Sequence, residues 1–255
     1  MTEPAVGTSP AFYARHGGRA ADWWTLLHPP YTIWHLSYVV LGAAMAPARD
    51  WGALGLTVLG FFLAVGVAAH ALDELQGRPL GTGISSRALW TVSGATLAGA
   101  VALGVYGVVG WGPEVNWPLA ATIPVGALLV VAYNLELFGG RLHNDLTFAA
   151  AWGGFPVVVG FVAQSPDVTW PVFGAAVAAT AGGVGSSYAQ RFLSTPARHL
   201  RRRTLDVTGT VTQLDGTLTP IDRASLLAPL EGALRALWWA VPLVAVAALL
   251  AGASG

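Results

Sequence analysis

The sequence predicts an all-α integral membrane protein with about seven transmembrane helices. Three observations support this fold class. Of the 255 residues, 54% are hydrophobic and only 10% are charged, whereas soluble domains usually carry about 25% charged residues. The apolar residues form runs close to the roughly 20 residues that a helix needs to cross a bilayer core. Eleven Trp residues fit the aromatic belts found at the two membrane interfaces.

The expected spans follow in chain order from these apolar runs. They cover about residues 30–47, 51–76, 87–110, 117–138, 146–164, 170–193 and 233–252. Pro30 suits the first turn of the first span, where a missing N–H loses no hydrogen bond. The connections at 47–50 and 110–113 are short, so we expect neighbouring helices to be antiparallel.

This reading divides the chain into four parts. A polar N-terminal segment (1–29) precedes a six-helix membrane core (30–193), and an Arg-rich loop (194–232) leads to a C-terminal transmembrane helix (233–255). The loop ends in an amphipathic piece around 226–237. We interpret the loop either as a tether on anionic lipid headgroups or as a lid that clamps an anion such as a diphosphate.

Charge placement predicts the orientation in the membrane. All 13 basic residues are Arg, and only Arg49 falls on the outer side if the N-terminus is cytoplasmic. The other 12 then lie in inner segments or at inner helix ends. Because Arg and Lys favour cytoplasmic loops, we expect the N-terminus inside and, after seven spans, the C-terminus outside.

Composition also limits the expected partners and sites. The chain has no Cys, which excludes disulfides and thiolate metal ligands. The formal net charge is zero, so there is no general attraction to nucleic acid. The first 25 residues are polar and lack the apolar core of a signal peptide. We expect membrane lipid and a lipophilic small molecule as partners, and the oligomeric state stays open.

Imidazoles and carboxylates gather at the expected inner ends of the spans. His28 and His35 flank the start of the first span, and His70, Asp73 and Glu74 end the second. Glu136 ends the fourth span, and His143 and Asp145 follow it. His70 and Glu74 share a helix face at a spacing of four, with Asp73 one residue off it. Ionisable groups in apolar spans are costly, which favours a functional role.

Such a mixture of ligands suits Fe, Zn or Mn, and helix bundles build metal sites from facing helices. The candidate metal ligands are His28, His35, His70, Glu74, Glu136 and His143. The candidate catalytic carboxylates are Asp73, Glu74 and Asp145. A metal-free polar or proton-handling cavity remains an alternative. So do structural ion pairs, such as Glu136 with Arg141 and Asp73 or Glu74 with Arg78.

Several stretches are similar to one family. Residues 27–42 (LHPPYTIWHLSYVVLG), 68–85 with RPLGTGIS, 133–161 and 202–205 (RRTL) resemble the UbiA superfamily of prenyltransferases over about residues 25–205. The resemblance implies a ring of helices around a central cavity, closed at the cytoplasmic side by polar loops. It also implies that isoprenyl groups are joined or cyclised there. Members usually have nine spans, so the C-terminal part of this chain departs from the family.

The acidic motifs of the family are largely replaced. The first motif, N-x-x-x-D-x-x-x-D, corresponds to His70, Glu74 and Arg78, and the region of the second, 186–197, holds no acid. Mg²⁺ prefers oxygen ligands, so these changes favour a softer metal. We therefore predict an intramembrane metal-dependent enzyme acting on an isoprenoid or other lipid, with one or two metal ions. Fe is favoured and would support an oxidoreductase or oxygenase, a Zn site could support hydrolysis, and Mn is a further possible metal.

Two other function classes stay open. The first is a UbiA-like prenyltransferase or terpene cyclase that uses Mg²⁺, with Arg78, Arg198 and Arg202 holding an isoprenyl diphosphate. The second is a haem-binding, quinone-binding or transport protein, since paired His residues can ligate haem. Neither the substrate nor the metal follows from the sequence.

Overall fold

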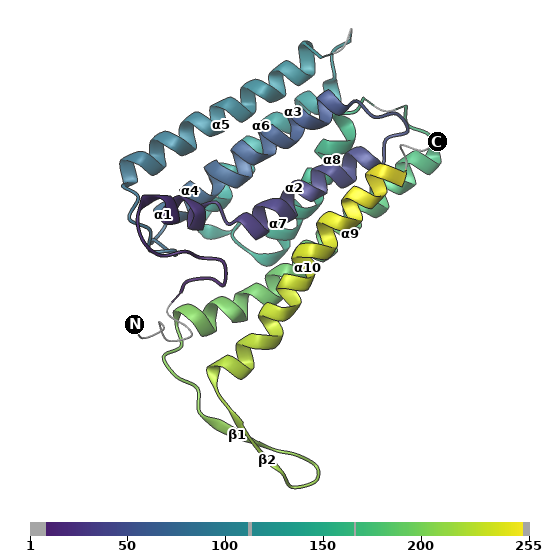
Figure 1. Ribbon diagram of the computed structural model, residues 1–255. Coiled ribbons are helices and arrows are strands. Elements are labelled where there is room, and N and C mark those ends of the chain that lie inside the picture. The colour runs from purple at the N-terminus through teal and green to yellow at the C-terminus, as the bar shows by residue number, and fades with distance from the viewer. Residues whose placement is uncertain (1–8, 112–113, 166, 252–255) are drawn as a thin grey trace.

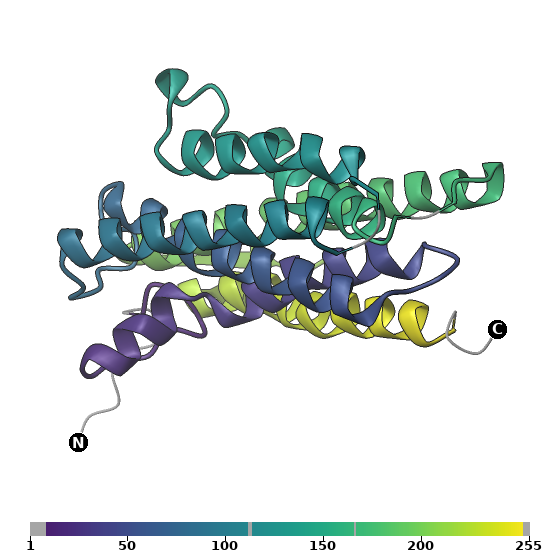
Figure 2. The same cartoon turned by 90° about the horizontal axis from the view of Figure 1, so that it is seen from above.

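The computed structural model describes residues 9–111, 114–165 and 167–251. These residues form an antiparallel bundle of long helices, shown from two directions in Figures 1 and 2. Five of its helical segments are long and apolar enough to cross a membrane. The predicted all-α membrane fold is therefore confirmed, and each of the seven predicted spans falls on helix over most of its described length.

The five apolar segments include three that are single helices, α5 (Ser86–Val109), α6 (Trp117–Asn134) and α10 (Arg223–Ala251). The other two are composite. One joins α3 (Trp51–Phe61), η1 (Phe62–Ala69) and α4 (His70–Leu75), and the other joins α7 (Asp145–Ala149), η3 (Ala150–Gly154) and α8 (Phe155–Val162). Helices α2 (Pro29–Ala44) and α9 (Trp170–Arg202) complete the bundle. Two short helices, α1 (Arg19–Leu26) and η2 (Phe138–Gly140), lie in the connections.

Helix starts agree with local sequence chemistry. Asp50 caps α3 by accepting hydrogen bonds from the backbone N–H groups of Gly52 and Ala53, at 2.8 and 2.9 Å. Asn116 caps α6 and Asn144 caps α7 in the same way. Asn and Asp side chains satisfy the free N–H groups of a first helical turn. These caps fix where the helices begin after short connections.

Helices α2 and α8 pack with their backbones in contact. A Cβ atom on Gly42 of α2 would lie 2.0 Å from the carbonyl oxygen of Val157. A Cβ atom on Gly160 of α8 would lie 2.1 Å from the carbonyl oxygen of Val39. Small residues allow such close approach between membrane helices. This contact holds α2 directly beside α8.

The segment 194–232 is mostly structured rather than an open loop. Helix α9 continues to Arg202, and α10 already begins at Arg223, so the amphipathic piece forms its first turns. Between them an antiparallel hairpin of β1 (Gly209–Thr212) and β2 (Leu218–Ile221) projects from the bundle (Figure 1). Residues 1–8 of the predicted N-terminal segment, and residues 252–255 with the predicted outside C-terminus, lie outside the described residues.

Candidate functional site

A cavity of about 440 Å³ lies at the end of the bundle where α2 and α10 begin and where α4, α6 and α9 end. We call it the polar cavity. Its walls include six residues that the sequence predicted to converge: His28, His35, His70, Asp73, Glu136 and His143. The predicted arginines Arg198 and Arg202 also line it. Side chains from distant parts of the chain therefore meet at one level of the bundle.

The N-terminal segment 10–13 covers one side of the polar cavity. The Arg202 guanidinium donates a hydrogen bond to the carbonyl oxygen of Pro10 at 3.0 Å. The ring of Tyr13 lies 5.4 Å from that of His28 and 5.6 Å from that of Tyr31, between centroids. The Trp24 indole N–H donates to the carbonyl oxygen of Tyr13 at 3.2 Å. The segment thus forms part of the cavity wall.

Three histidines of the cavity share one hydrogen-bonding pattern. The Nδ1 atoms of His28, His35 and His70 lie 2.8, 2.9 and 3.0 Å from the carbonyl oxygens of Leu26, Trp152 and Gly66. A carbonyl oxygen only accepts, so each Nδ1 carries the proton, and Nε2 of the neutral ring is an acceptor. The His28 and His70 rings lie 4.3 Å apart, between centroids. Burial, with His70 close by, lowers the pKa of His28 well below its usual value.

Glu74 does not reach the polar cavity, although the sequence predicted it as both a metal ligand and a catalytic group. Its fully buried carboxylate accepts hydrogen bonds from the backbone N–H groups of Leu80 and Thr82 and from the Thr82 hydroxyl, each at 2.9 Å. It therefore holds the loop after α4. Asp73, rather than Glu74, accompanies His70 in the cavity wall.

Two more predicted residues, Asp145 and Arg78, do not line the cavity and make local contacts instead. The Asp145 carboxylate pairs with the Arg191 guanidinium at 2.7 Å, which joins α7 to α9. Arg78 donates to the carbonyl oxygen of Ile84 at 2.5 Å and to the Ser86 hydroxyl at 2.6 Å. Arg78 thus stabilises the loop before α5 rather than reaching the cavity.

The carboxylates and imidazoles do not form a ready-made metal site. Across the described ranges, no three His, Asp or Glu side chains group closely enough to hold a metal ion. Nδ1 of His143 lies 3.9 Å from the Glu136 carboxylate, and the His143 ring stacks on Tyr133. The Fe, Zn or Mn centre of an oxygenase stays a prediction.

Positive charge gathers on the α9 side of the polar cavity, where Arg191, Arg198, Arg201, Arg202 and Arg203 line the wall. Glu231 neutralises Arg201 and Asp145 neutralises Arg191. Arg198 donates to the Thr195 hydroxyl at 3.4 Å, and Arg202 donates to a carbonyl, so neither partner carries a charge. Burial, with Arg191 and Arg202 nearby, lowers the pKa of Arg198.

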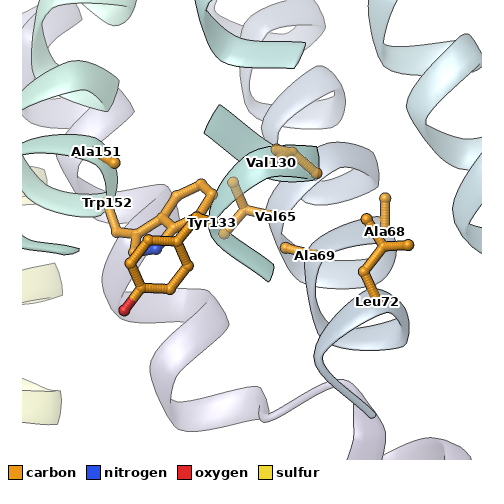
Figure 3. Packing of buried hydrophobic residues seen from close by; sticks show 8 residues of the cluster. All are labelled: Val65, Ala68, Ala69, Leu72, Val130, Tyr133, Ala151 and Trp152. Atoms are coloured by element: carbon orange, nitrogen blue, oxygen red, sulfur yellow. The ribbon is translucent and has the colours of Figure 1, made fainter. Parts of the chain in front are cut away.

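A second cavity of about 120 Å³ lies deeper in the bundle, among α3, η1, α5, α6, η3 and α8. We call it the apolar cavity, because Leu, Val, Ala, Ile, Gly and aromatic side chains dominate its walls. Val65 and Trp152 line both cavities. These two residues belong to the cluster in Figure 3, where Trp152 lies beside Tyr133. The cavities therefore adjoin at this cluster.

Tyr133 and Gln190 are among the wall residues that sequence reasoning missed. Both are buried, and the Tyr133 hydroxyl and Gln190 Oε1 have no hydrogen-bond partner in the described chain. Only a weak feature of the sequence pointed to these two residues. Tyr133 begins a stretch that resembles the family, but Tyr is common in membrane helices. Gln190 lies in the region of the second acidic motif, where the family has an acid and this chain has none.

No family model matches the sequence, and no curated protein matches it significantly. Among solved structures, the chain is similar to a UbiA homologue from Archaeoglobus fulgidus bound to Cd²⁺, with a TM-score of 0.52 and 15% identity. The match covers 91% of this chain and 85% of that one. It agrees with the resemblance carried by the sequence motifs. The protein therefore has a UbiA-like fold, embedded in the membrane.

Proposed function

We propose that this protein binds an isoprenyl diphosphate and transfers or cyclises its isoprenyl group, as a prenyltransferase-type membrane enzyme. One observation carries the proposal: an arginine-lined polar cavity adjoins an apolar cavity at Val65 and Trp152. A diphosphate suits the first environment and an isoprenyl chain suits the second. A ligand with both parts would occupy both cavities.

Arg198 and Arg202 are the residues best suited to the diphosphate. Both line the polar cavity, and the partners of their guanidinium groups are uncharged oxygens. Guanidinium groups bind phosphate oxygens through paired, charge-assisted hydrogen bonds. A bound anion would also offset the repulsion between Arg198 and Arg202. Arg202 would exchange its contact with Pro10 for one with the ligand.

The cavity carboxylates do not fit the Mg²⁺ cluster that the family resemblance implies. The Glu231 carboxylate is held by Arg201, and Glu136 lies next to His143. Asp73 is the one other carboxylate in the described part of the wall. Since Mg²⁺ needs several oxygen ligands, we assign the diphosphate to arginine and derive no step through a metal. The predicted orientation would place this cavity on the cytoplasmic side.

The proposal is tested by comparing two affinities, that of farnesyl diphosphate and that of farnesol. Both are measured on the purified protein in nanodiscs with EDTA present. The two probes differ in the anionic group alone. We expect the diphosphate to bind about 100-fold more tightly, because two arginines contribute charge-assisted hydrogen bonds. Equal affinities would contradict the proposal.

Matched variants locate the binding site. Arg198→Gln combined with Arg202→Gln should remove most of the preference for the diphosphate. Arg87→Gln, at an exposed position in the first turn of α5, should leave it unchanged. Enzyme activity is tested by release of inorganic diphosphate from geranyl, farnesyl and geranylgeranyl diphosphates. Binding without release from any of them would reduce the proposal to a binding protein.

A further inference from the structure

The hairpin between α9 and α10 exposes apolar side chains to its surroundings. We call residues 207–222, which contain β1 and β2, the hairpin arm. Leu214 at its tip is fully exposed, and Leu218 and Val211 are 66% and 42% exposed. Every strand residue except Ile221 is exposed. Because an isolated two-stranded hairpin is only marginally stable in water, a surface that covers these side chains would stabilise the arm.

The hairpin arm is acidic, whereas the end of α9 that leads into it is rich in arginine. Residues 207–222 contain Asp215 and Asp222 and no Lys, Arg or His. The Asp215 carboxylate accepts a hydrogen bond from the backbone N–H of Thr217 at 2.9 Å, and that of Asp222 accepts one from the N–H of Ser225 at 2.7 Å. These bonds lower the pKa of both carboxyl groups. The arm therefore carries two negative charges at neutral pH.

This charge argues against the surrounding membrane as the surface that covers the arm. Anionic headgroups attract Lys and Arg, and they repel carboxylates for the same electrostatic reason. The arm has no basic residue with which to bind such headgroups. The lipid tether expected for 194–232 therefore suits the arginines of α9 but not the hairpin. A protein surface that is both basic and apolar fits the arm better.

The foot of the arm offers a surface of that kind. We call Arg203, Leu205 and Leu226 the arm base. A hydrogen bond from Arg223 to the carbonyl oxygen of Leu205, at 3.4 Å, joins the end of α9 to the start of α10 at this place. Leu205 and Leu226 are 94% and 40% exposed, and Arg203 is exposed as well. The arm base thus complements the apolar, acidic tip in charge and in hydrophobicity.

Two copies in one membrane would present tip and base to each other at the same level. Copies that insert with the same topology carry their polar cavities, and therefore their arms, on the same side of the bilayer. Figure 1 shows the arm extending from the ends of α9 and α10, on the side away from α5 and α6. Paired strands separate each tip from its own base. A two-fold axis beside α9 and α10 would bring each tip to the other copy's base, and two-fold dimers are the commonest oligomers.

We propose that this protein forms a two-fold dimer in which the hairpin arm of each copy packs on the arm base of the other. Leu214 lies against Leu205 and Leu226 of the second copy, and Asp215 pairs with its Arg203. The inference concerns assembly and does not rest on the proposed function.

A photo-cross-linker at the tip identifies what covers the arm. The chain has no Cys, so Leu214→Cys supplies a single thiol for an apolar benzophenone maleimide. The labelled full-length protein, half of it isotopically heavy, is illuminated in vesicles of phosphatidylethanolamine and phosphatidylglycerol. We expect a product of twice the chain mass, with light and heavy copies joined at peptides that contain Arg203, Leu205 or Leu226. Cross-links to lipid, to the same chain or to another part of the second copy would overturn the inference, as would no cross-link.

Charge variants in the same labelled protein test the ion pair. Asp215→Asn removes the charge but keeps an oxygen acceptor for the N–H of Thr217, so the turn is retained. We expect about threefold less two-copy product, because an exposed ion pair contributes little. Arg203→Glu replaces attraction by repulsion and should lower the yield about tenfold. Asp167→Asn, at an exposed position before α9, is the matched control and should leave the yield unchanged. Yields equal to the parent in both arm variants would overturn the inference.

Discussion

Glu231 of α10 and Arg201 of α9 form a two-point ion pair in the wall of the polar cavity. Arg201 Nε donates to Glu231 Oε1, and Arg201 Nη2 donates to Glu231 Oε2 at 2.8 Å. Both side chains are largely buried. Arg235 lies 3.9 Å from the same carboxylate. This pair ties the end of α9 to the start of α10 and so holds the arginine side of the cavity in place.

Removing the charge of Glu231 should therefore destabilise the protein. Glu231→Gln leaves the Arg201 guanidinium buried without its counter-ion, at an expected cost of about 3–5 kcal/mol. The measurement is denaturant unfolding in detergent micelles. Asp206→Asn, at an exposed position next to the hairpin, is the control with little expected effect. Equal stability of the Glu231→Gln and parent proteins would mean that the pair contributes nothing.

Glu74→Gln should lower stability without weakening farnesyl diphosphate binding. The carboxylate accepts three hydrogen bonds from the loop after α4, and neutralising it weakens charge-assisted bonds, at an expected cost of about 2–3 kcal/mol. Unfolding and diphosphate binding are measured on the same preparation. A large loss of affinity with unchanged stability would instead support the predicted metal-ligand or catalytic role of Glu74.

Gly160→Ala should separate α2 from α8. The new methyl group would lie 2.1 Å from the carbonyl oxygen of Val39, so the backbones must move apart, and overpacking of this kind costs about 1–3 kcal/mol. Gly174→Ala on α9 is the matched control, because a Cβ atom there meets nothing within 4 Å. A thermal unfolding scan of both variants checks the difference. Equal midpoints would show that the helix contact tolerates the added volume.

Acid should destabilise the protein in part through His28, which precedes the first residue of α2. Burial lowers its folded-state pKa, whereas the unfolded value is about 6.5. Between those values the unfolded chain binds a proton that the folded chain does not, so stability is complete above about pH 6.5 and falls as the pH drops below it. His28 has a φ of 46°, a conformation that Asn tolerates. Stability measured against pH should therefore fall less steeply for His28→Asn, and equal slopes would contradict this.

The helices were predictable because a bilayer requires long apolar runs, and such runs are visible in the sequence. The prediction ended the sixth span at residue 193, since the following residues are polar, yet α9 continues to Arg202. Ser, Thr, Gln and Arg lower hydropathy without breaking a helix. The continuation matters because it carries Arg198 and Arg202 along the cavity wall.

The convergence of the predicted residues also followed from the sequence, since antiparallel helices return His28, His70 and Glu136 to the same end of the bundle. Their roles did not follow. Spacing identifies the depth and face of a residue but not which loop amide it satisfies, so the spacing of four from His70 favoured Glu74 over Asp73. The chain used Glu74 to hold its own loop and left Asp73 in the cavity.

The residues at which the two cavities adjoin both belong to wide helical turns. Val65 lies in the π-helical segment η1 and Trp152 lies in the π-helical segment η3. A π turn inserts one residue relative to an α-helix and rotates everything beyond it by about 100°. If residues 62–69 were wound as an ordinary α-helix with no residue removed, His70 and Asp73 would turn by about that angle, away from the polar cavity. The width of that turn, more than the identity of any side chain, decides which face of α4 lines the polar cavity.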